Sequence, residues 1–360
     1  MMNKKCKGCG AILQTMDKNA IGYTPKEEAD YCQRCFRITH YDDVMISMKQ
    51  GVDGDAVLRK IAEMDALILW VVDLFDFEAN LIHGLNRHLM GKDIVMVATK
   101  RDLLPISVGN EKLCNFIMSR LKQEGIVVSG IVICGDLAQH AKRDDNASIE
   151  EVQYAIDHYR KNRDVIVMGT ANAGKSTLLN ALCDHQTLTV SRHPGTTLDF
   201  NELEMDGYTI YDTPGITRMD SILTHVDDRL LKTIIPLKPL KARNYQLYEN
   251  QTLSVGGLVR LDIIGCTSVS CVCYFSDRLK IHRSKQEKAN QLWSEHINEL
   301  LSPAMCDNYT EMKTFGLDHI QEKTDIVIHG LGWFCISGNV EHVKVYVPKE
   351  SSVTFRKAMI

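Results

Sequence analysis

Eight consecutive residues in the middle of the chain have the types and spacing needed to bind phosphate. Gly169 to Ser176 read GTANAGKS, which fits the P-loop pattern G-x-x-x-x-G-K-[ST]. Glycines at both ends let the backbone curl around phosphates and present its N–H groups at the positive end of the following helix. We expect Lys175 to reach the β- and γ-phosphates and Ser176 to offer its hydroxyl to Mg²⁺. The alternative is a glycine-rich turn that binds nothing.

Two short segments after the P-loop fit the same chemistry. Asp212-Thr213-Pro214-Gly215 ends a strand-like run, where an aspartate can hold Mg²⁺ through water and a glycine N–H can meet the γ-phosphate. Pro194-Gly195-Thr196-Thr197 lies between the P-loop and this segment, and we expect Thr197 to complete the Mg²⁺ shell. Each tetrapeptide alone also fits an ordinary turn. Their order and spacing favour phosphate binding.

A third segment resembles an element that reads guanine. Thr99-Lys100-Arg101-Asp102 is close to N-K-x-D, in which the aspartate accepts from guanine N1–H and the 2-amino group. Adenine has neither donor and would leave a desolvated carboxylate unpaired. Taken alone, Asp102 is better explained as the cap of the following helix. With a P-loop in the same chain, guanine recognition is the favoured interpretation, and a further base-contacting loop is expected at Cys134-Gly135-Asp136.

Four cysteines near the N-terminus have metal-ligand spacing. Cys6 and Cys9 form one C-x-x-C pair, and Cys32 and Cys35 form another. Two such pairs separated by a polar loop can close tetrahedrally on one Zn²⁺, whereas a redox motif needs only one pair. Because four thiolates leave no open position, this zinc would be structural.

The elements that must position these residues follow an α/β pattern. Strands are expected at residues 66–73, 94–99, 131–134 and 165–168, with others beginning at 200 and 208. A capping box at Ser148 predicts a helix with Ile149, Val152, Ile156 and Tyr159 on its apolar face. TKRD precedes the P-loop by some seventy residues, the reverse of the order in an ordinary small GTPase. The pattern therefore predicts a complete parallel sheet that is circularly permuted, in a three-layer domain.

The residues after Gly215 leave this pattern. The segment 229–285 holds ten Lys/Arg against three Asp/Glu, with Tyr245, Tyr248, Tyr274 and Phe275 among them. Strands are expected at 252–262, 267–275, 325–336 and 343–347, and a helix from Ser284. A basic, aromatic-bearing β-surface suits RNA phosphates and base stacking. The alternative is a solvated edge with core aromatics.

Composition limits the class of protein. With 44% hydrophobic and 24% charged residues and a formal net charge of −4, the chain is typical of soluble globular proteins and is not strongly basic. The first residues have no apolar core for a signal peptide, and the apolar run 66–72 stops at Asp73, well short of a membrane span. We expect a cytoplasmic protein whose other eight cysteines are buried thiols.

Taken together, the motifs GTANAGKST, PGTT, DTPG, TKRD and ICG, the four cysteines, and the late runs QTLSVGGLVRLD and KTDIVIHGLGW resemble the YqeH family of circularly permuted GTPases. The resemblance covers essentially the whole chain. It implies a bacterial GTPase that acts in assembly of the small (30S) ribosomal subunit and has a TRAP-like RNA-binding C-terminal domain. The chain departs from the family at Thr99, where asparagine is usual, and at Cys134-Gly135, where Ser-Ala is common.

The resulting expectations can be stated by residue. We expect a zinc module at 1–45, a permuted GTPase domain at 46–222 and a β-rich α+β C-terminal domain at 223–360. GTP or GDP would contact Thr99, Lys100, Asp102, Cys134, Gly135, Asn172, Ala173, Gly174, Lys175, Ser176, Thr177, Thr196, Thr197, Asp212 and Gly215. Ser176, Thr197 and Asp212 would bind Mg²⁺. Lys175, Asn172, Thr197 and Gly215 would support hydrolysis, and resemblance to potassium-activated GTPases implies K⁺ at Asn172. The partners would be the small subunit and rRNA, with no DNA and no membrane.

Two other functions stay open. The chain could be an RNA-binding assembly scaffold with a weak or structural nucleotide site, as the departures at Thr99 and Cys134 suggest. It could also be an ATPase, although Asp102 argues against adenine.

Overall fold

The computed structural model describes residues 53–135, 147–184 and 200–360 and, nearer the N-terminus, Lys4, Cys6, 12–17, 22–26, Ala29 and Cys32. Two compact units can be distinguished. The first holds the described residues of 1–72, 84–97 and 127–217, and the second holds 73–83, 98–126 and 218–360.

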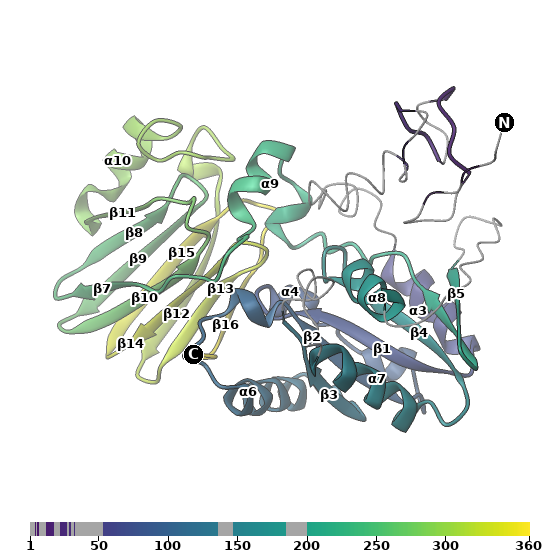
Figure 1. Ribbon diagram of the computed structural model, residues 1–360. Coiled ribbons are helices and arrows are strands. Elements are labelled where there is room, and N and C mark those ends of the chain that lie inside the picture. The colour runs from purple at the N-terminus through teal and green to yellow at the C-terminus, as the bar shows by residue number, and fades with distance from the viewer. Residues whose placement is uncertain are drawn as a thin grey trace. The chain divides into compact units, whose positions relative to one another are not determined.

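A six-stranded sheet is the centre of the first unit, in the order β3-β2-β1-β4-β6-β5 (Figure 1). Its strands are β1 (Ala66–Asp73), β2 (Ile94–Thr99), β3 (Gly130–Ile133), β4 (Asp164–Gly169), β5 (Asn201–Met205) and β6 (Tyr208–Asp212). β4 pairs in parallel with β1 on one side and with β6 on the other. Every residue of β1 and β2 is buried, as expected of continuous apolar runs covered on both faces.

The last strand of this sheet corrects the expectation of a wholly parallel sheet. β5 pairs antiparallel with β6. Only Asp206 and Gly207 connect the two strands, and Gly207 has a φ of 82°. A two-residue connection of this kind returns the chain beside itself, so the sheet is mixed.

Four helices accompany this sheet in the described part of the first unit. They are α3 (Gly54–Glu63), α5 (Leu85–His88), α7 (Ala147–Tyr159) and α8 (Lys175–Asp184). The apolar face predicted for α7 is confirmed, because Ile149, Val152 and Ile156 are buried in one core with residues of β1 and β4. α8 contributes Leu178 and Leu182 to the same core, which fixes the helix that follows the P-loop.

The second unit is β-rich (Figure 1). One five-stranded sheet has the order β16-β13-β14-β10-β7 and the other β11-β8-β9-β15-β12. The strands are β7 (Arg243–Leu247), β8 (Gln251–Val255), β9 (Val259–Cys266), β10 (Val269–Phe275), β11 (Ile281–Lys285), β12 (Lys313–Ile320), β13 (Thr324–Ile328), β14 (Gly332–Ser337), β15 (Val340–Val347) and β16 (Val353–Lys357). All eight strand pairs in these two sheets are antiparallel.

Several boundaries predicted for the second unit are wrong. The segment 252–262 is not one strand, because a turn at 256–258 separates β8 from β9, and 325–336 likewise forms β13 and β14. The helix predicted from Ser284 begins only at Ala289. Ser284 lies in β11 opposite Thr252, so pairing with β8 prevails over its local capping signal.

The second unit also contains the two segments that follow β1 and β2. They carry α4 (Phe77–Asn80) and α6 (Asn110–Gln123), and the unit also includes α9 (Asp228–Ile234) and α10 (Ala289–His296). Phe77 and Phe116 pack edge to face with ring centroids 5.5 Å apart. The loops that follow β1 and β2 are therefore built into the same unit as the C-terminal strands.

Candidate functional site

The P-loop connects β4 to α8 as its sequence predicts. Gly174 and Asn172 have φ angles of 98° and 64°, so the loop uses the left-handed region twice. Gly169 lies so close to the carbonyl oxygen of Val71 that a Cβ would collide with it. A glycine is therefore required where β4 passes into the loop.

Lys175 is held over the P-loop by backbone acceptors. Its Nζ donates to the carbonyl oxygens of Gly169 at 3.0 Å and Thr170 at 2.9 Å. Burial lowers the pKa of Lys175 to about 8, while the charge of Asp212 acts in the opposite direction. Because phosphate oxygens are stronger acceptors than carbonyls, the same ammonium is well placed to transfer its hydrogen bonds to a nucleotide.

The DTPG segment is joined to the P-loop by backbone hydrogen bonds. The Ala171 N–H donates to Ile216 O at 2.9 Å, and the Ile216 N–H donates to Gly169 O at 3.1 Å. A Cβ on Gly215 would lie 2.9 Å from the Cα of Ala171. Asp212 ends β6, and its negative charge acts to raise the pKa of Lys175. This arrangement brings together the predicted P-loop, Asp212 and Gly215 within the first unit.

The remaining residues predicted in the first unit differ in exposure. Ser176 and Thr177 are exposed at the start of α8, whereas Ala173 is buried. Cys134 is also buried, and its thiol donates to Ser148 O at 3.6 Å. Burial raises the pKa of the Cys134 thiol to about 12, and Gly135 follows it half-buried. Thr196 and Thr197 lie outside the described residues.

The TKRD segment lies in the second unit, at the end of β2. Thr99 is buried, Lys100 has a left-handed φ of 59°, and Asp102 is exposed in a short 3₁₀ turn at Arg101–Leu103. The Lys100 Nζ lies 2.7 Å from Asp73 Oδ2. Sequence reasoning missed Asp73, although a charged residue at the end of the apolar run 66–72 was a signal.

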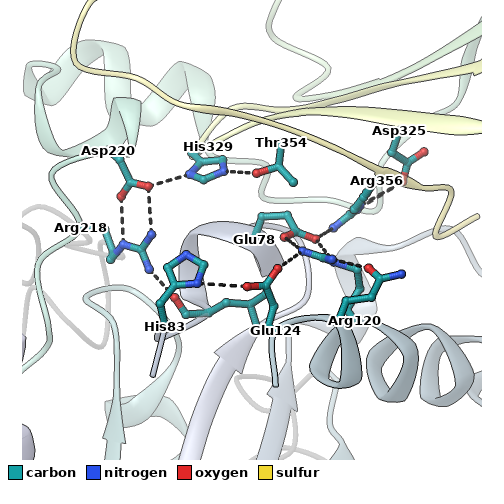
Figure 2. Close-up of polar contacts among 12 residues, drawn as sticks. Glu78, His83, Arg120, Glu124, Arg218, Asp220, Asp325, His329, Thr354 and Arg356 are labelled. Atoms are coloured by element: carbon teal, nitrogen blue, oxygen red, sulfur yellow. Dashed lines mark hydrogen bonds and ion pairs between the residues drawn. The ribbon is translucent and has the colours of Figure 1, made fainter. Parts of the chain in front are cut away.

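A buried ion network surrounds Glu78 of α4 (Figure 2). Its carboxylate accepts from Arg120 at 2.8 Å and from Arg356 at 2.9 Å. Arg356 also donates to Asp325 at 3.3 Å. Burial by itself would raise the pKa of Glu78, but the two guanidinium groups lower it below its ordinary value. The network ties α4 and α6 to β13 and β16.

A second polar cluster joins the β13–β14 turn to residues soon after the DTPG segment (Figure 2). The Nδ1 of His329 lies 3.0 Å from Asp220 Oδ2, and its Nε2 lies 2.9 Å from Thr354 Oγ1. Arg218 donates twice to the Asp220 carboxylate, each at 2.9 Å. Burial opposes the shift, but hydrogen bonds from His329 and Arg218 hold the pKa of Asp220 well below its usual range.

Two of the four predicted zinc ligands are described. Cys6 and Cys32 are both buried, and the Cys32 N–H donates to Cys6 Sγ at 3.1 Å. Cys9 and Cys35 lie outside the described residues. Among the described residues, no group of three or more His, Cys, Asp or Glu is arranged to hold a metal ion.

The P-loop, the Asp212 to Gly215 segment and the sheet that carries them define a P-loop GTPase domain. A family model for a 50S ribosome-binding GTPase matches residues 164–255, and one for the YqeH-like C-terminal domain matches residues 268–359. The chain belongs to the YqeH family, because YqeH of Bacillus subtilis (strain 168) is 36% identical over 369 residues, covering 99% of both chains.

Two further relatives match with lower identity or over a shorter stretch. The NO-associated protein 1, chloroplastic/mitochondrial, of Arabidopsis thaliana is 25% identical over 396 residues, covering 92% of this chain and 69% of that protein. The tRNA modification GTPase MnmE of Bradyrhizobium sp. (strain BTAi1 / ATCC BAA-1182) is 46% identical over 81 residues, covering 21% of this chain and 18% of that one. The GTPase family model and the YqeH relative together identify the protein as a GTP-hydrolysing enzyme. A GTPase domain of this kind binds GTP or GDP with Mg²⁺. In the part of the chain that the structure describes, no helix is long and apolar enough to cross a membrane.

Proposed function

We propose that this chain is a GTP-hydrolysing switch that acts in the assembly of the small (30S) ribosomal subunit and binds rRNA in a nucleotide-dependent way. Its membership of the YqeH family supports this proposal most strongly. The proposed setting is the cytoplasm, with domains at 1–45, 46–222 and 223–360. The γ-phosphate would order the Thr196–Thr197 and Gly215 segments, and its loss would free them.

Circular permutation explains how such a switch could act. β1, β2 and β3 come before the P-loop strand β4 in the chain. In the sheet they lie side by side on one edge of β4, in the order β3-β2-β1-β4. We propose that Thr99, Lys100 and Asp102, with Cys134 and Gly135, read the guanine base in this permuted order. After Gly215 the chain passes through Arg218 and Asp220, a 3₁₀ turn at Ile222–Thr224 and α9 before it enters the C-terminal strands.

The proposed metal ions have separate roles. Ser176, Thr197 and Asp212 would hold Mg²⁺, which neutralises charge on the phosphates. Ile216 is buried, and its side chain lies against Gly54, so it cannot orient an attacking water. We propose that Asn172 instead helps to hold K⁺ beside the transferred phosphoryl group. Equal GTP turnover in K⁺ and Na⁺ at one ionic strength would remove this ion from the mechanism.

The second unit offers a smaller RNA surface than its sequence suggested. Tyr274 and Phe275 are buried, and Tyr274 stacks on Trp333 at 4.9 Å, so both belong to the core. Arg260 is buried and paired with Asp262, and Arg243 donates to the carbonyl oxygen of Leu279. Of the ten Lys/Arg in 229–285, the other eight are exposed.

A basic, aromatic patch remains on β7, β11 and the turn after β7. Tyr248 is 67% exposed, and Arg283 and Lys285 are exposed on alternate residues of β11. Arg283 is close enough to the half-buried Tyr245 for its positive charge to act on the pKa of the tyrosine. The Lys285 Nζ lies 3.6 Å from Glu249 Oε2. We propose that this patch stacks single-stranded rRNA bases on the tyrosines and contacts phosphates through Arg283 and Lys285.

The combined variant Arg283→Gln and Lys285→Gln tests the patch and the function together. We expect cosedimentation with small subunits in a GTP analogue to weaken roughly five- to fiftyfold and the salt dependence to flatten, because up to two phosphate contacts are lost. GTP turnover without subunits should not change. The control combines Lys112→Gln and Lys349→Gln, which removes the same charge from exposed positions elsewhere.

The outcomes separate the competing functions. If the double variant binds subunits as well as the control does, the RNA surface is misplaced. If the parent binds equally in GTP analogue and GDP and shows no multiple turnover, the scaffold function replaces the switch. If the parent does not bind subunits in either state, the ribosomal function itself is rejected.

We also propose that Cys6, Cys9, Cys32 and Cys35 hold one structural Zn²⁺. The Cys32 N–H that donates to Cys6 Sγ is the type of hydrogen bond that stabilises a zinc-bound thiolate. Metal analysis should give one zinc per chain, and Cys32→Ser combined with Cys35→Ser should abolish it. Cys114→Ser is a suitable control, because Cys114 lies in α6. A parent protein that stays below half an equivalent after zinc repletion contradicts the site.

A further inference from the structure

Asp73 is a buried carboxylate that the guanine-reading motif does not include. It ends β1, and its side chain is 5% exposed. Its Oδ1 accepts the Phe75 N–H at 2.8 Å, and its own N–H donates to Asn80 Oδ1 at 3.3 Å. The carboxylate is therefore held by the backbone on one side and directed at Lys100 on the other, 2.7 Å away.

The backbone of Lys100 has an unfavourable left-handed conformation, so contacts elsewhere must hold the residue in place. A φ of 59° is uncommon for a residue with a Cβ. The Leu74 N–H donates to Thr99 O at 3.1 Å and ties the residue after Asp73 to the residue before Lys100. The ion pair and this hydrogen bond together fix both the backbone of the TKRD turn and the direction of the Lys100 side chain.

A second carboxylic acid, Asp76, follows Asp73 in the chain and is mostly neutral. Burial, and then the charge of Asp73, raise the pKa of Asp76 to about 8, although Gly330, Lys100 and Arg218 act in the opposite direction. At neutral pH Asp76 is mostly protonated, and its Oδ1 accepts the Gly330 N–H at 2.8 Å. The carboxyl group that pairs with Lys100 is that of Asp73, at 2.7 Å.

We propose that Asp73 is a positioning residue for guanine recognition, which acts by fixing Lys100 and the turn that presents Asp102. This inference rests on the proposed assignment of residues 99–102 to the base. A lysine side chain that is already immobilised does not lose its rotamer freedom when the nucleotide arrives. Asp73 therefore increases affinity for guanine nucleotides without touching them.

The test measures GDP affinity and GTP kinetics of Asp73→Asn at pH 7. We expect the Kd for GDP to rise about five- to thirtyfold. KM for GTP should rise while kcat stays within twofold, because the altered contact lies at the base and not at the transferred phosphoryl group. Asp76→Asn is the matched control. It replaces a mostly neutral acid by a neutral amide that still accepts from Gly330, so GDP affinity should not change.

A double-mutant cycle with Lys100→Met shows whether Asp73 acts through Lys100. Asp73→Asn should have little further effect in the Lys100→Met background. An equal loss in both backgrounds, or a lower melting temperature with unchanged GDP affinity, would reduce Asp73 to a structural role and overturn the proposal. If Asp73→Asn does not fold, Asp73→Glu replaces it, and a fall in kcat at constant KM overturns the proposal.

The preference of the parent protein for GDP over ADP tests separately whether residues 99–102 read guanine, on which this inference rests. If the parent binds GDP no better than ADP, residues 99–102 do not read guanine and both proposals fail. If the preference holds but Asp73→Asn matches the parent, only the role of Asp73 is rejected.

Discussion

Glu78→Ala should lower the free energy of unfolding by about 3–5 kcal/mol, because removing one partner from a buried ion pair leaves the other charge uncompensated. Two guanidinium groups depend on this carboxylate, since Arg120 and Arg356 both donate to it. Urea unfolding monitored by tryptophan fluorescence would measure the change. Glu299→Ala is the control, because the Glu299 side chain is 75% exposed, and it should cost less than about 0.5 kcal/mol.

The stabilisation that Glu78 provides should depend on pH with a defined sign. The pKa of Glu78 is lower in the folded protein than its ordinary value of 4.5, so the unfolded state takes up its proton first as the pH falls. The stabilisation is complete above the unfolded pKa and is lost as the pH falls through the folded pKa. The difference between parent and Glu78→Gln should therefore be constant from about pH 6 to 8 and shrink below about pH 4. A difference that grows towards acid contradicts the network.

Asp102→Asn should reduce the preference for GDP over ADP by roughly a hundredfold or more. The carboxylate would accept from two guanine donors, whereas an amide presents its own N–H groups to one of them and leaves a polar clash. Titration calorimetry with GDP and ADP measures both affinities. Because Asp102 is exposed, the variant should melt close to the parent temperature.

Thr99→Asn is the companion variant. Thr99 is buried at the end of β2, and its hydroxyl cannot span the contacts of an asparagine amide. We expect tighter GDP binding, about five- to hundredfold, with an unchanged preference over ADP. If Asp102→Asn keeps its preference, residue 102 does not read the base, and if Thr99→Asn binds no better than the parent, Thr99 is not a weakened contact.

The sequence predicted the elements that depend on local pattern. The strands at 66–73 and 94–99 and the apolar face of α7 follow directly from runs and spacing, and they are confirmed. The P-loop was equally readable, because its pattern requires glycines, and both are needed in the fold: Gly169 lies against the Val71 carbonyl, and Gly174 has a φ of 98°. What local pattern encodes was therefore predictable.

The features that the sequence did not predict depend on distant partners. Ser284 looks like a helix cap until β8 pairs with its strand, and Tyr274 looks like a surface aromatic until Trp333 covers it. Asp73 and Glu78 gain their roles only from Lys100, Arg120 and Arg356. The hydrophobic periodicity of a short stretch of sequence carries no information about partners that are distant in the chain.

The buried pair of Glu78 and Arg356 has a consequence for the order in which the chain is made. The two residues are separated by 278 positions in the sequence. During synthesis, Glu78 and Arg120 emerge long before Arg356, and β1 emerges before its neighbour β4. Loops of this length close late, so the network around Glu78 is completed only after the chain as far as Arg356 has been made.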